Sequence, residues 1–225
     1  MADIIALMGS KGAGKDTVAR YIKKNNVIYD KVIIMSFADA LKDAVSAIFN
    51  FRRDMLEGAT KTSREWRETE LPYLSKVMNR PVTPRYLLQQ IGTNILRKHL
   101  YNDIWVDSVL VKISNLEEAA KANNKRNLYI ITDCRFKNEI QKLIDTGNNV
   151  KFVEIDRRNR NTYVYNWAYK YNNTKNLIIK AMCLWKLRKV HRSEWDWIGV
   201  VKDPILLYNI GSLKNLEGLV KSLII

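Results

Sequence analysis

A glycine-rich loop near the N-terminus constrains the fold more than any other feature of the sequence. Residues 9–15 read Gly-Ser-Lys-Gly-Ala-Gly-Lys and fit the pattern G-x-x-x-x-G-K. The short apolar run at residues 3–8 predicts a buried strand before the loop, and residues 15–25 predict a helix after it. In this context the loop turns several backbone N–H groups inward, and these groups and the helix N-terminus hold phosphate oxygens. The alternative is a glycine-rich turn with a chance lysine.

Four further apolar runs predict strands, and periodic segments between them predict helices. The expected strands are residues 31–36, 127–132, 150–156 and 205–209, and the expected helices are 39–49, 84 to about 100, 105–123, 136–146, about 175–189 and 212–223, with Ser212 as a cap. Residues 50–83 are expected to be irregular, with a short helix at about 65–71. Strands that alternate with helices predict right-handed crossovers and a parallel sheet covered on both faces. We therefore expect a three-layer α/β/α fold of the P-loop NTPase type around a five-stranded parallel sheet.

Length and composition favour one intracellular domain. The 225 residues fit a single domain, residues 1–225, with a moderate insertion, and 47% apolar residues allow a sizeable core. The two cysteines offer neither a disulfide framework nor a set of metal ligands. We see no signal peptide and no apolar stretch of about 20 residues, so we expect a cytoplasmic protein without a membrane partner. The net charge of +15 suits a nucleic-acid partner, phosphorylated small molecules, or a simple compositional bias.

The loop supplies the first candidate residues for catalysis and binding. Lys15 should reach the β- and γ-phosphates of a nucleotide. Asp16 stands where a Ser or Thr usually follows the lysine and ligates Mg²⁺. Asp16 could ligate Mg²⁺ directly or through water, or serve as an acid-base group on the acceptor side, while Thr17 could contact the α-phosphate. The expected ATP-binding residues of the loop are Gly9, Lys11, Gly12, Ala13, Gly14, Lys15, Asp16 and Thr17.

A second polar site follows the predicted strand at residues 127–132. The carboxylate of Asp133 would end this strand beside the loop, where it could hold or orient Mg²⁺ or its waters. The guanidinium of Arg135 would point into the same crevice and could bind a phosphate with two parallel hydrogen bonds. The alternative is that Asp133 caps the following helix and Arg135 is an unrelated surface residue.

Five motifs in order give the sequence a resemblance to a known family. They are G-x-x-x-x-G-K-D-T at residues 9–17, F-A-D-x-L-K at 37–42, P-R-x-L-L-Q-x-x-G-T at 84–93, D-x-R-F-x-N-E at 133–139 and H-x-S-E at 191–194. Together they span nearly the whole chain. The set resembles the phage-type deoxynucleoside monophosphate kinases, which are P-loop kinases related to adenylate kinase. The resemblance implies a core sheet, an acceptor-binding region at about 50–104 and a lid with a helical insertion at about 157–198.

The resemblance also implies roles for individual residues. Asp16 and Asp133 would lie near Mg²⁺ and the acceptor, and Arg135 would bridge phosphates. The acceptor nucleotide would be lined by Asp39, Lys42, Arg85 and Gln89. Simpler roles stay open for three of these residues: a solvated side chain for Arg85, an ordinary helix-surface position for Gln89 and an N-cap for Asp39. Gly92 would be explained by close packing or by a helix break, and Trp105 by packing.

The expected lid carries arginines and then a basic, aromatic segment. Arg157, Arg158 and Arg160 could fold over the triphosphate and neutralise charge in the transition state, or form a solvated charge run. Residues 161–190 interleave lysines with Tyr and Trp, which suits packing as a helical hairpin, a homodimer contact or single-stranded nucleic acid. His191 and Glu194 are weak site candidates, and without a Cys/His partner set His191 does not indicate a metal site.

The sequence therefore supports three hypotheses. The first is a kinase that transfers the γ-phosphoryl group of ATP, with Mg²⁺, to a deoxynucleoside monophosphate without a covalent protein intermediate. The second keeps the chemistry but changes the acceptor, as in phosphomevalonate kinases or dephospho-coenzyme A kinases. The third is a nucleic-acid-binding protein that retains a P-loop, although nucleic acid is not expected as the main substrate.

Overall fold

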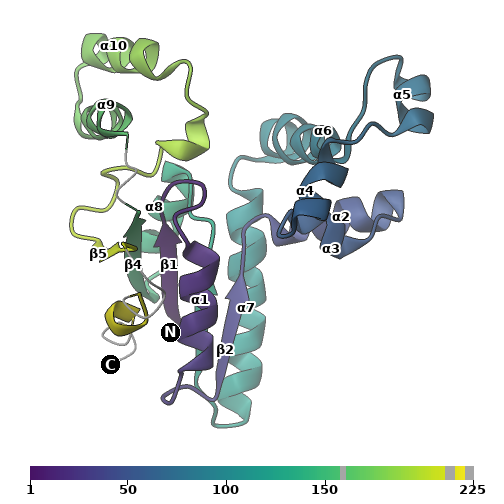
Figure 1. Cartoon of the computed structure of the whole chain (residues 1–225). Coiled ribbons are helices and arrows are strands. Elements are labelled where there is room, and N and C mark those ends of the chain that lie inside the picture. The colour runs from purple at the N-terminus through teal and green to yellow at the C-terminus, as the bar shows by residue number, and fades with distance from the viewer. Residues whose placement is uncertain (158–160, 211–215, 221–225) are drawn as a thin grey trace. The chain divides into compact units, whose positions relative to one another are not determined.

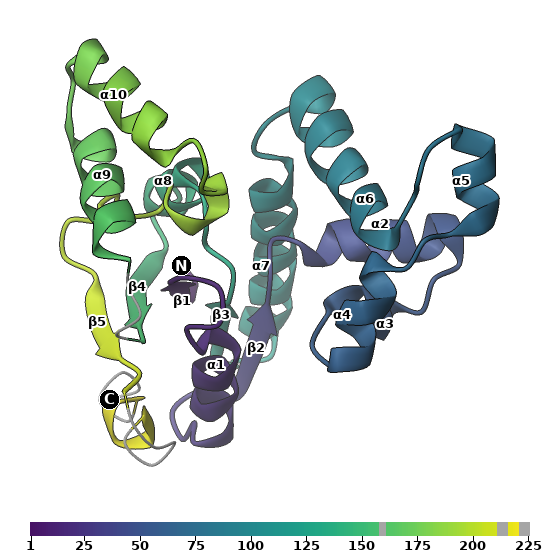
Figure 2. The ribbon, with the colours of Figure 1, turned by 45° about the horizontal axis from the view of Figure 1, so that its top comes forward.

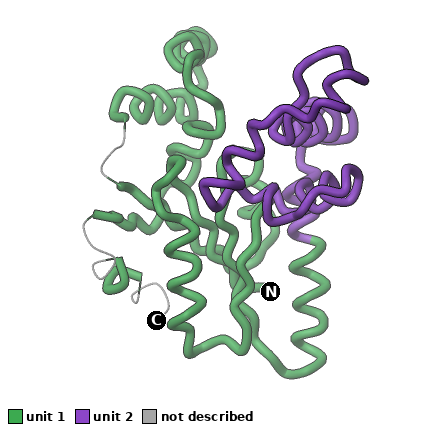
Figure 3. The backbone as a smooth tube through the Cα atoms, turned by 45° about the vertical axis from the view of Figure 1, so that its right-hand side comes forward, with its two compact units in different colours: residues 1–36, 111–225 green, residues 37–110 purple. Residues whose placement is uncertain are grey.

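The computed structural model describes residues 1–157, 161–210 and 216–220. The chain separates into two compact units (Figure 3): unit 1 comprises Met1–Ser36 and Val111–Ile225, and unit 2 comprises Phe37–Leu110. The region expected at about 50–104 to bind the acceptor falls inside unit 2, which extends beyond it on both sides.

Unit 1 contains a five-stranded parallel sheet (Figure 1). Its strands are β1 (Asp3–Met8), β2 (Lys31–Met35), β3 (Asn127–Ile131), β4 (Asn149–Asp156) and β5 (Ile205–Tyr208), in the order β2-β3-β1-β4-β5. Every pair in the sheet is parallel. This confirms the expected α/β class and the positions of all five strands. The connection that leaves β1 leads to β2 at one side of the sheet, and the connection that leaves the neighbouring strand β3 leads to β4 on the other side. Open α/β sheets bind ligands where neighbouring connections diverge in this way, which here is between β1 and β3.

Both faces of the sheet carry the core of unit 1. On one face Leu7 of β1 and Val18 of helix α1 (Lys15–Lys24) are fully buried, in a cluster that takes in every strand and residues of the segment 216–220. Met8 points to the opposite face and is buried there. Figure 1 places helix α8 (Lys137–Asp145) and the second half of α7 (Ile104–Ala122) on that side. Burial on both faces explains why the central strands are continuous apolar runs rather than alternating ones.

A helical hairpin follows β4 in unit 1. Helices α9 (Thr162–Asn173) and α10 (Leu177–Leu187) lie side by side, as Figures 1 and 2 both show. The sequence predicted the second helix but not the first. The side chain of Asn161 accepts a hydrogen bond from the N–H of Val164, and this cap starts α9. A 3₁₀ turn, η2 (Arg192–Glu194), comes after the hairpin.

Unit 2 is helical where the sequence was expected to be mostly irregular. It contains α2 (Asp39–Phe49), α3 (Arg53–Glu57), α4 (Lys61–Glu68), α5 (Pro72–Met78) and α6 (Pro84–Gln89). The expected short helix at about 65–71 is therefore wrong in its bounds, and two more helices were missed. Thr60 and Ser63 form a reciprocal capping box that starts α4, and Pro72 takes the first turn of α5, where a missing N–H costs nothing.

The helix expected from residue 84 to about 100 changes its winding partway. The α-helical turns of α6 are followed by a π-helical segment, η1 (Gln90–Leu100). Gly92 lies in this segment, and a Cβ there would be 2.5 Å from Cδ2 of Leu41. The indole N–H of buried Trp105 donates to the carbonyl oxygen of Gly92 over 3.1 Å. Close helix packing thus accounts for Gly92, and the packing role of Trp105 is confirmed.

Some expectations lie outside the described residues. These are Arg158, Arg160, the cap at Ser212 and both ends of the helix expected at 212–223, of which residues 216–220 are described as helical. Within the part of the chain that the structure covers, none of the helices has the length and apolar content needed to cross a bilayer.

Candidate functional site

The glycine-rich loop between β1 and α1 takes a backbone path that its glycines make possible. Gly9, Gly12 and Gly14 have φ angles of 143°, 80° and 102°, which side-chain-bearing L-residues rarely adopt. The loop ends directly at the first residue of α1, so its N–H groups and the N-terminus of α1 lie at the carboxyl end of the central strand. This is the strand–loop–helix context that phosphate binding requires.

Lys15 lies folded into the loop. Its side-chain ammonium donates to the carbonyl oxygens of Gly9 and Ser10 over 2.7 and 2.9 Å, and the residue is 7% exposed. Burial, and next the positive charge of Arg135, lower the pKa of Lys15 to about 8. The carboxylates that oppose this shift belong to Asp16, Glu194 and Asp133. We call these five residues, Lys15, Asp16, Asp133, Arg135 and Glu194, the P-loop cluster.

The acidic members of the P-loop cluster are suited to a divalent cation. Asp133 follows β3 by two residues, and Ser36 donates its hydroxyl to Oδ2 of Asp133 over 3.0 Å. Asp16 is exposed in the first turn of α1. The described residues contain no group of three or more potential metal-binding side chains. Mg²⁺ does not need such a group, because it usually keeps several waters and binds one or two carboxylates together with substrate phosphates.

The start of α8 shows which groups cap it. The carboxylate of Glu139 accepts hydrogen bonds from the N–H groups of Arg135 and Phe136 over 2.9 and 3.0 Å. The carboxylate of Asp196 accepts from the N–H of Lys137 over 2.9 Å. Glu139 and Asp196 therefore satisfy the first turn of α8, which is the role that the sequence left open for Asp133.

Two residues from the carboxyl ends of β4 and β5 brace the loop. Arg157 donates from its guanidinium to the carbonyl oxygen of Gly12 over 3.1 Å. Asn209 donates from its side-chain amide to the carbonyl oxygen of Ala13 over 2.7 Å. The structure thus brings Arg157, an expected lid residue, to the loop. Asn209 was not singled out: the sequence placed it as the last residue of the strand expected at 205–209, whereas in the structure it directly follows β5.

A turn after the helical hairpin also reaches the loop. Glu194 Oε2 accepts a hydrogen bond from the backbone N–H of Lys11 over 3.0 Å, and Glu194 Oε1 lies 3.5 Å from a guanidinium nitrogen of Arg135. The sequence marked Glu194 only as a weak candidate within the H-x-S-E motif. The structure makes it a member of the P-loop cluster.

In unit 2 the expected acceptor residues belong to a charged cluster. Nζ of Lys42 lies 2.6 Å from Oε2 of Glu57 and 3.8 Å from Oδ1 of Asp39. Arg85 on α6 forms an ion pair with Glu68 at the end of α4. Asp39 is the first residue of α2 and Ala38 is its N-cap, so the capping alternative for Asp39 is wrong.

Arg67 joins this cluster and was not predicted from the sequence. It donates to the carbonyl oxygen of Glu57 over 3.3 Å, and its buried Nε has no hydrogen-bond partner among the residues that the structure describes. Burial, and next the positive charge of Arg85, lower the pKa of Arg67. Two arginines close enough to repel each other favour an anion beside them. Gln89 is exposed on α6, and its expected contact with the acceptor stays a prediction.

The aromatic residues of the hairpin mostly pack within it or onto the turn that follows. Tyr171 packs edge-on against buried Trp195, with ring centroids 5.4 Å apart, and Tyr165 stacks on Tyr169. This agrees with the packing interpretation of residues 161–190. Trp185 on α10 is 57% exposed, and the guanidinium of Arg188 lies 4.4 Å from its ring centroid. The homodimer contact stays a prediction for this outer face of α10.

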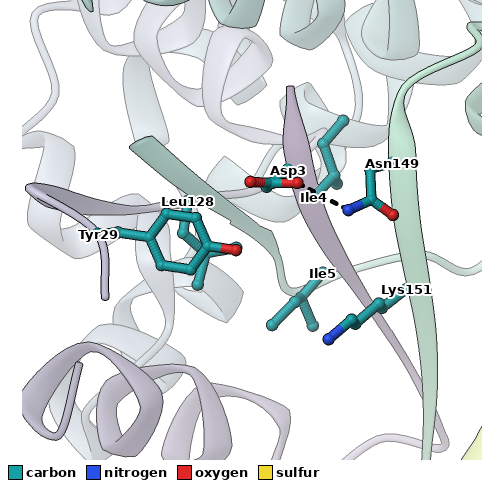
Figure 4. A pocket seen from close by; sticks show the side chains of 7 residues that line it. All are labelled: Asp3, Ile4, Ile5, Tyr29, Leu128, Asn149 and Lys151. Atoms are coloured by element: carbon teal, nitrogen blue, oxygen red, sulfur yellow. Dashed lines mark hydrogen bonds between the residues drawn. The ribbon is translucent and has the colours of Figure 1, made fainter. Parts of the chain in front are cut away.

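A small hollow lies at the amino-terminal ends of the strands, opposite the ends that carry the loop (Figure 4). It is lined by Asp3, Ile4, Ile5, Tyr29, Leu128, Asn149 and Lys151. Its polar side chains bond with one another or with neighbours: Asn149 donates to Asp3 over 2.7 Å, and Arg126 pairs with Asp3. Since β1, β3 and β4 begin here, the hollow is at the wrong end of the strands for the ligand site of an open α/β sheet.

Comparisons with known proteins agree with this arrangement. Residues 59–179, more than half of the chain, match the family model for deoxynucleotide monophosphate kinase. A proposed deoxynucleotide monophosphate kinase of Acanthamoeba polyphaga mimivirus is 29% identical over 168 residues, which cover 68% of this chain and 74% of that protein. A gluconokinase structure from Sinorhizobium meliloti covers 98% of this chain and 90% of its own at 9% identity, with a TM-score of 0.37, which is too low to support an inference.

Proposed function

The chain belongs to the deoxynucleotide monophosphate kinase family, and on that premise we propose that it transfers the γ-phosphoryl group of ATP to a deoxynucleoside monophosphate. The observation that carries the proposal is the buried ammonium of Lys15 inside the glycine-rich loop, with Arg135 and three carboxylates around it. This arrangement supplies the positive charge and the N–H groups that a triphosphate needs, beside oxygen ligands for its cation.

In this proposal unit 1 binds the donor. The N–H groups of the loop and the ammonium of Lys15 hold the β- and γ-phosphates, and Arg157 adds positive charge from the end of β4. Arg135 binds the transferred phosphoryl group, and fixed hydrogen-bond donors stabilise its negative charge. No covalent intermediate with the protein forms. The acceptor phosphate oxygen attacks the γ-phosphorus in line, and ADP leaves.

We also propose Mg²⁺ as the cofactor, held by Asp16 and Asp133 directly or through water. Both carboxylates act on the ammonium of Lys15, so they belong to the same site, and both offer the oxygen ligands that Mg²⁺ prefers. A Mg²⁺ ion held by these two carboxylates would supply positive charge to the phosphate oxygens. The residues of the chain position the phosphates around it.

Unit 2 would bind the acceptor nucleotide. Arg85, together with Arg67, suits the phosphate of the monophosphate, because each guanidinium can donate two parallel hydrogen bonds to it. Lys42 and Asp39 would line the same nucleotide, and Gln89 would hydrogen-bond to an edge of the base. We place the enzyme in the cytoplasm, where ATP and nucleoside monophosphates are available.

A turnover assay across acceptors tests the proposed function. Purified protein with ATP and Mg²⁺ should release ADP in the presence of one or more of the four deoxynucleoside monophosphates, because unit 2 would then have a bound phosphate acceptor. Removal of Mg²⁺ with a chelator should stop the release. Phosphomevalonate and dephospho-coenzyme A serve as rival acceptors. A folded sample that binds ATP but turns over only a rival acceptor, or none, would sink the proposal.

The depressed pKa of Lys15 predicts how donor binding depends on pH. Below about pH 7 Lys15 is charged, and its contribution to ADP affinity should not change with pH. Above about pH 8 the free protein loses this proton, whereas bound phosphates raise the pKa of Lys15 and favour the charged form. We therefore expect ADP affinity to fall above pH 8, by at most about tenfold per pH unit.

Calorimetry in two buffers of different ionisation enthalpy measures this linkage directly. ADP binding at pH 8.5 should be accompanied by proton uptake at Lys15. At pH 6.5 Lys15 is already protonated, so its proton uptake on ADP binding should be close to zero. Lys15→Arg keeps a positive charge at both pH values and should remove the uptake, whatever it does to affinity. Equal affinity and no proton uptake at both pH values would show that the ammonium does not meet the phosphates.

A further inference from the structure

Glu194 lies where a phosphate oxygen is expected to bind. Its carboxylate accepts the N–H of Lys11, one of the loop amides expected to bind phosphate, over 3.0 Å. The other carboxylate oxygen lies 3.5 Å from Arg135, the arginine assigned above to the transferred phosphoryl group. Carboxylates and phosphates make the same charge-assisted hydrogen bonds to N–H groups and guanidinium ions, so they compete for the same donors.

The backbone of the turn that carries Glu194 is firmly held. Next to it, the carboxylate of Asp196 is 1% exposed and accepts from the N–H of Lys137 over 2.9 Å and from Nε of Arg192 over 3.0 Å. The indole N–H of buried Trp195 donates to the carbonyl oxygen of Val190 over 3.3 Å. The position of Glu194 is therefore set by its neighbours and is not that of a freely moving surface residue.

The side chain of Glu194 can still leave the loop. It is 29% exposed, and its three side-chain torsions allow the carboxylate to swing toward solvent while the backbone stays in place. Asp196 also holds the first turn of α8, which begins two residues after Arg135. The turn and Arg135 thus stay close together whether or not Glu194 is on the loop.

We propose that Glu194 is a built-in competitor of the donor phosphates: it occupies the Lys11 N–H and Arg135 in the nucleotide-free protein and is displaced when ATP or ADP binds. One N–H group cannot donate a full hydrogen bond to two acceptors, and a carboxylate beside a triphosphate adds repulsion between like charges. Displacement then frees Arg135 for phosphate at the moment the donor arrives. This inference rests on the proposed function, because it assumes a nucleotide in the loop.

Replacing Glu194 tests the competition. Glu194→Gln keeps the shape but removes the charge, and Glu194→Ala removes both acceptor oxygens. We expect the Kd for ADP and for a non-hydrolysable ATP analogue to fall about threefold for Gln and up to about tenfold for Ala. The control is Glu118→Gln, which removes an equal charge from the exposed face of α7 near the amino-terminal edge of the sheet, and its Kd should equal that of the unchanged protein.

A second readout does not depend on nucleotide. In a ¹⁵N-edited amide spectrum of the full chain, the Lys11 resonance should move in Glu194→Gln, because Glu194 accepts the Lys11 N–H, and it should stay in place in Glu118→Gln. Addition of ADP to the unchanged protein should move the same resonance.

The outcomes separate this inference from the proposed function. If the unchanged protein turns over a deoxynucleoside monophosphate but both Glu194 variants bind ADP equally or more weakly, the competition is refuted and the function stands. Weaker binding would mean that Glu194 serves the bound nucleotide. If the unchanged protein binds neither ADP nor the ATP analogue, both proposals fail. An unmoved Lys11 resonance in Glu194→Gln also overturns the competition.

Discussion

Lys15→Ala is expected to lower turnover by about a thousandfold or more while leaving the fold intact. The change removes the ammonium that the structure places inside the glycine-rich loop, where it bonds the carbonyl oxygens of Gly9 and Ser10. In a site shielded from water, one cation aimed at the developing charge on the phosphates is worth far more than it is in solution. Steady-state rates with saturating ATP and acceptor measure the loss.

Stability should change much less than activity in Lys15→Ala. Folding has to bury the charge of this lysine, as its depressed pKa shows, and that cost offsets the two hydrogen bonds that the variant loses. We expect the free energy of unfolding to stay within about 1 kcal/mol of its original value. Urea unfolding followed by circular dichroism measures it.

Lys23→Ala is the matched control, because it removes the same charge from an exposed position in the last turn of α1. It should retain its turnover and its ADP affinity. Near-normal turnover in Lys15→Ala would show that the donor does not bind at this loop. Equal losses in both lysine variants would show that net charge, rather than the position of Lys15, matters.

The parallel sheet could be predicted because its signal is local and redundant. Strands β1 and β3 are continuous apolar runs, and a strand buried on both faces needs such a run wherever it occurs. The glycine-rich loop added a second, independent signal for β1 and α1. Alternation of strands and helices predicted parallel pairing, which the structure confirms, whereas the order of the strands along the sheet comes from the structure.

The helices of unit 2 could not be predicted from periodicity, because several are too short to show it. Helix α3 has five residues and α5 has seven, about one and two turns. The starts of α4 and α5 depend on single features, the cap at Thr60 and the proline at residue 72, rather than on a repeated apolar stripe. The segment that changes from α to π winding at Gln90 contacts Leu41 and Trp105 through Gly92, and these contacts with residues outside the segment are not visible in its local sequence.

Part of the candidate site could likewise be predicted from the sequence, and part could not. Asp133 and Arg135 follow one predicted strand and Lys15 ends the loop that follows another, so topology alone indicated that they lie together, and in the structure the charges of Arg135 and Asp133 act on Lys15. Glu194 and Asn209 reach the loop from segments about 180 and 195 residues further along the chain. Nothing in the local sequence of Glu194 indicates a carboxylate on the loop, because that position depends on the fold of the turn that carries it.

Gly9→Ala is expected to damage both stability and nucleotide binding, more than a change at any other loop glycine. Its φ of 143° is strained for alanine, and the new Cβ would lie 2.6 Å from the carbonyl oxygen of Ile155. That oxygen belongs to the backbone of β4, which pairs with β1 up to Met8, so it cannot move away without breaking the sheet. We expect a loss of about 2–4 kcal/mol in the free energy of unfolding and no measurable ADP binding.

Gly12, Gly14 and Gly147 provide graded comparisons. A Cβ at Gly12 meets no atom of the described part of the chain within 4 Å, so Gly12→Ala should cost only the strain of its φ of 80°, about 1 kcal/mol. At Gly14 the clash is with the flexible side-chain amide of Asn209, so the cost should be intermediate. Gly147, after α8, has a φ of 68° and open space, and Gly147→Ala measures backbone strain away from the loop.

Urea unfolding and calorimetric ADP titration of the four alanine variants should therefore rank Gly9 first, then Gly14, with Gly12 and Gly147 similar in stability. ADP binding should survive fully only in Gly147→Ala, because the other three glycines shape the path of the loop. If Gly9→Ala lost no more stability than Gly147→Ala, the loop would not press against β4 as described. The path of the loop, and with it the direction of the N–H groups assigned to the phosphates, would then not depend on the close approach of Gly9 to Ile155.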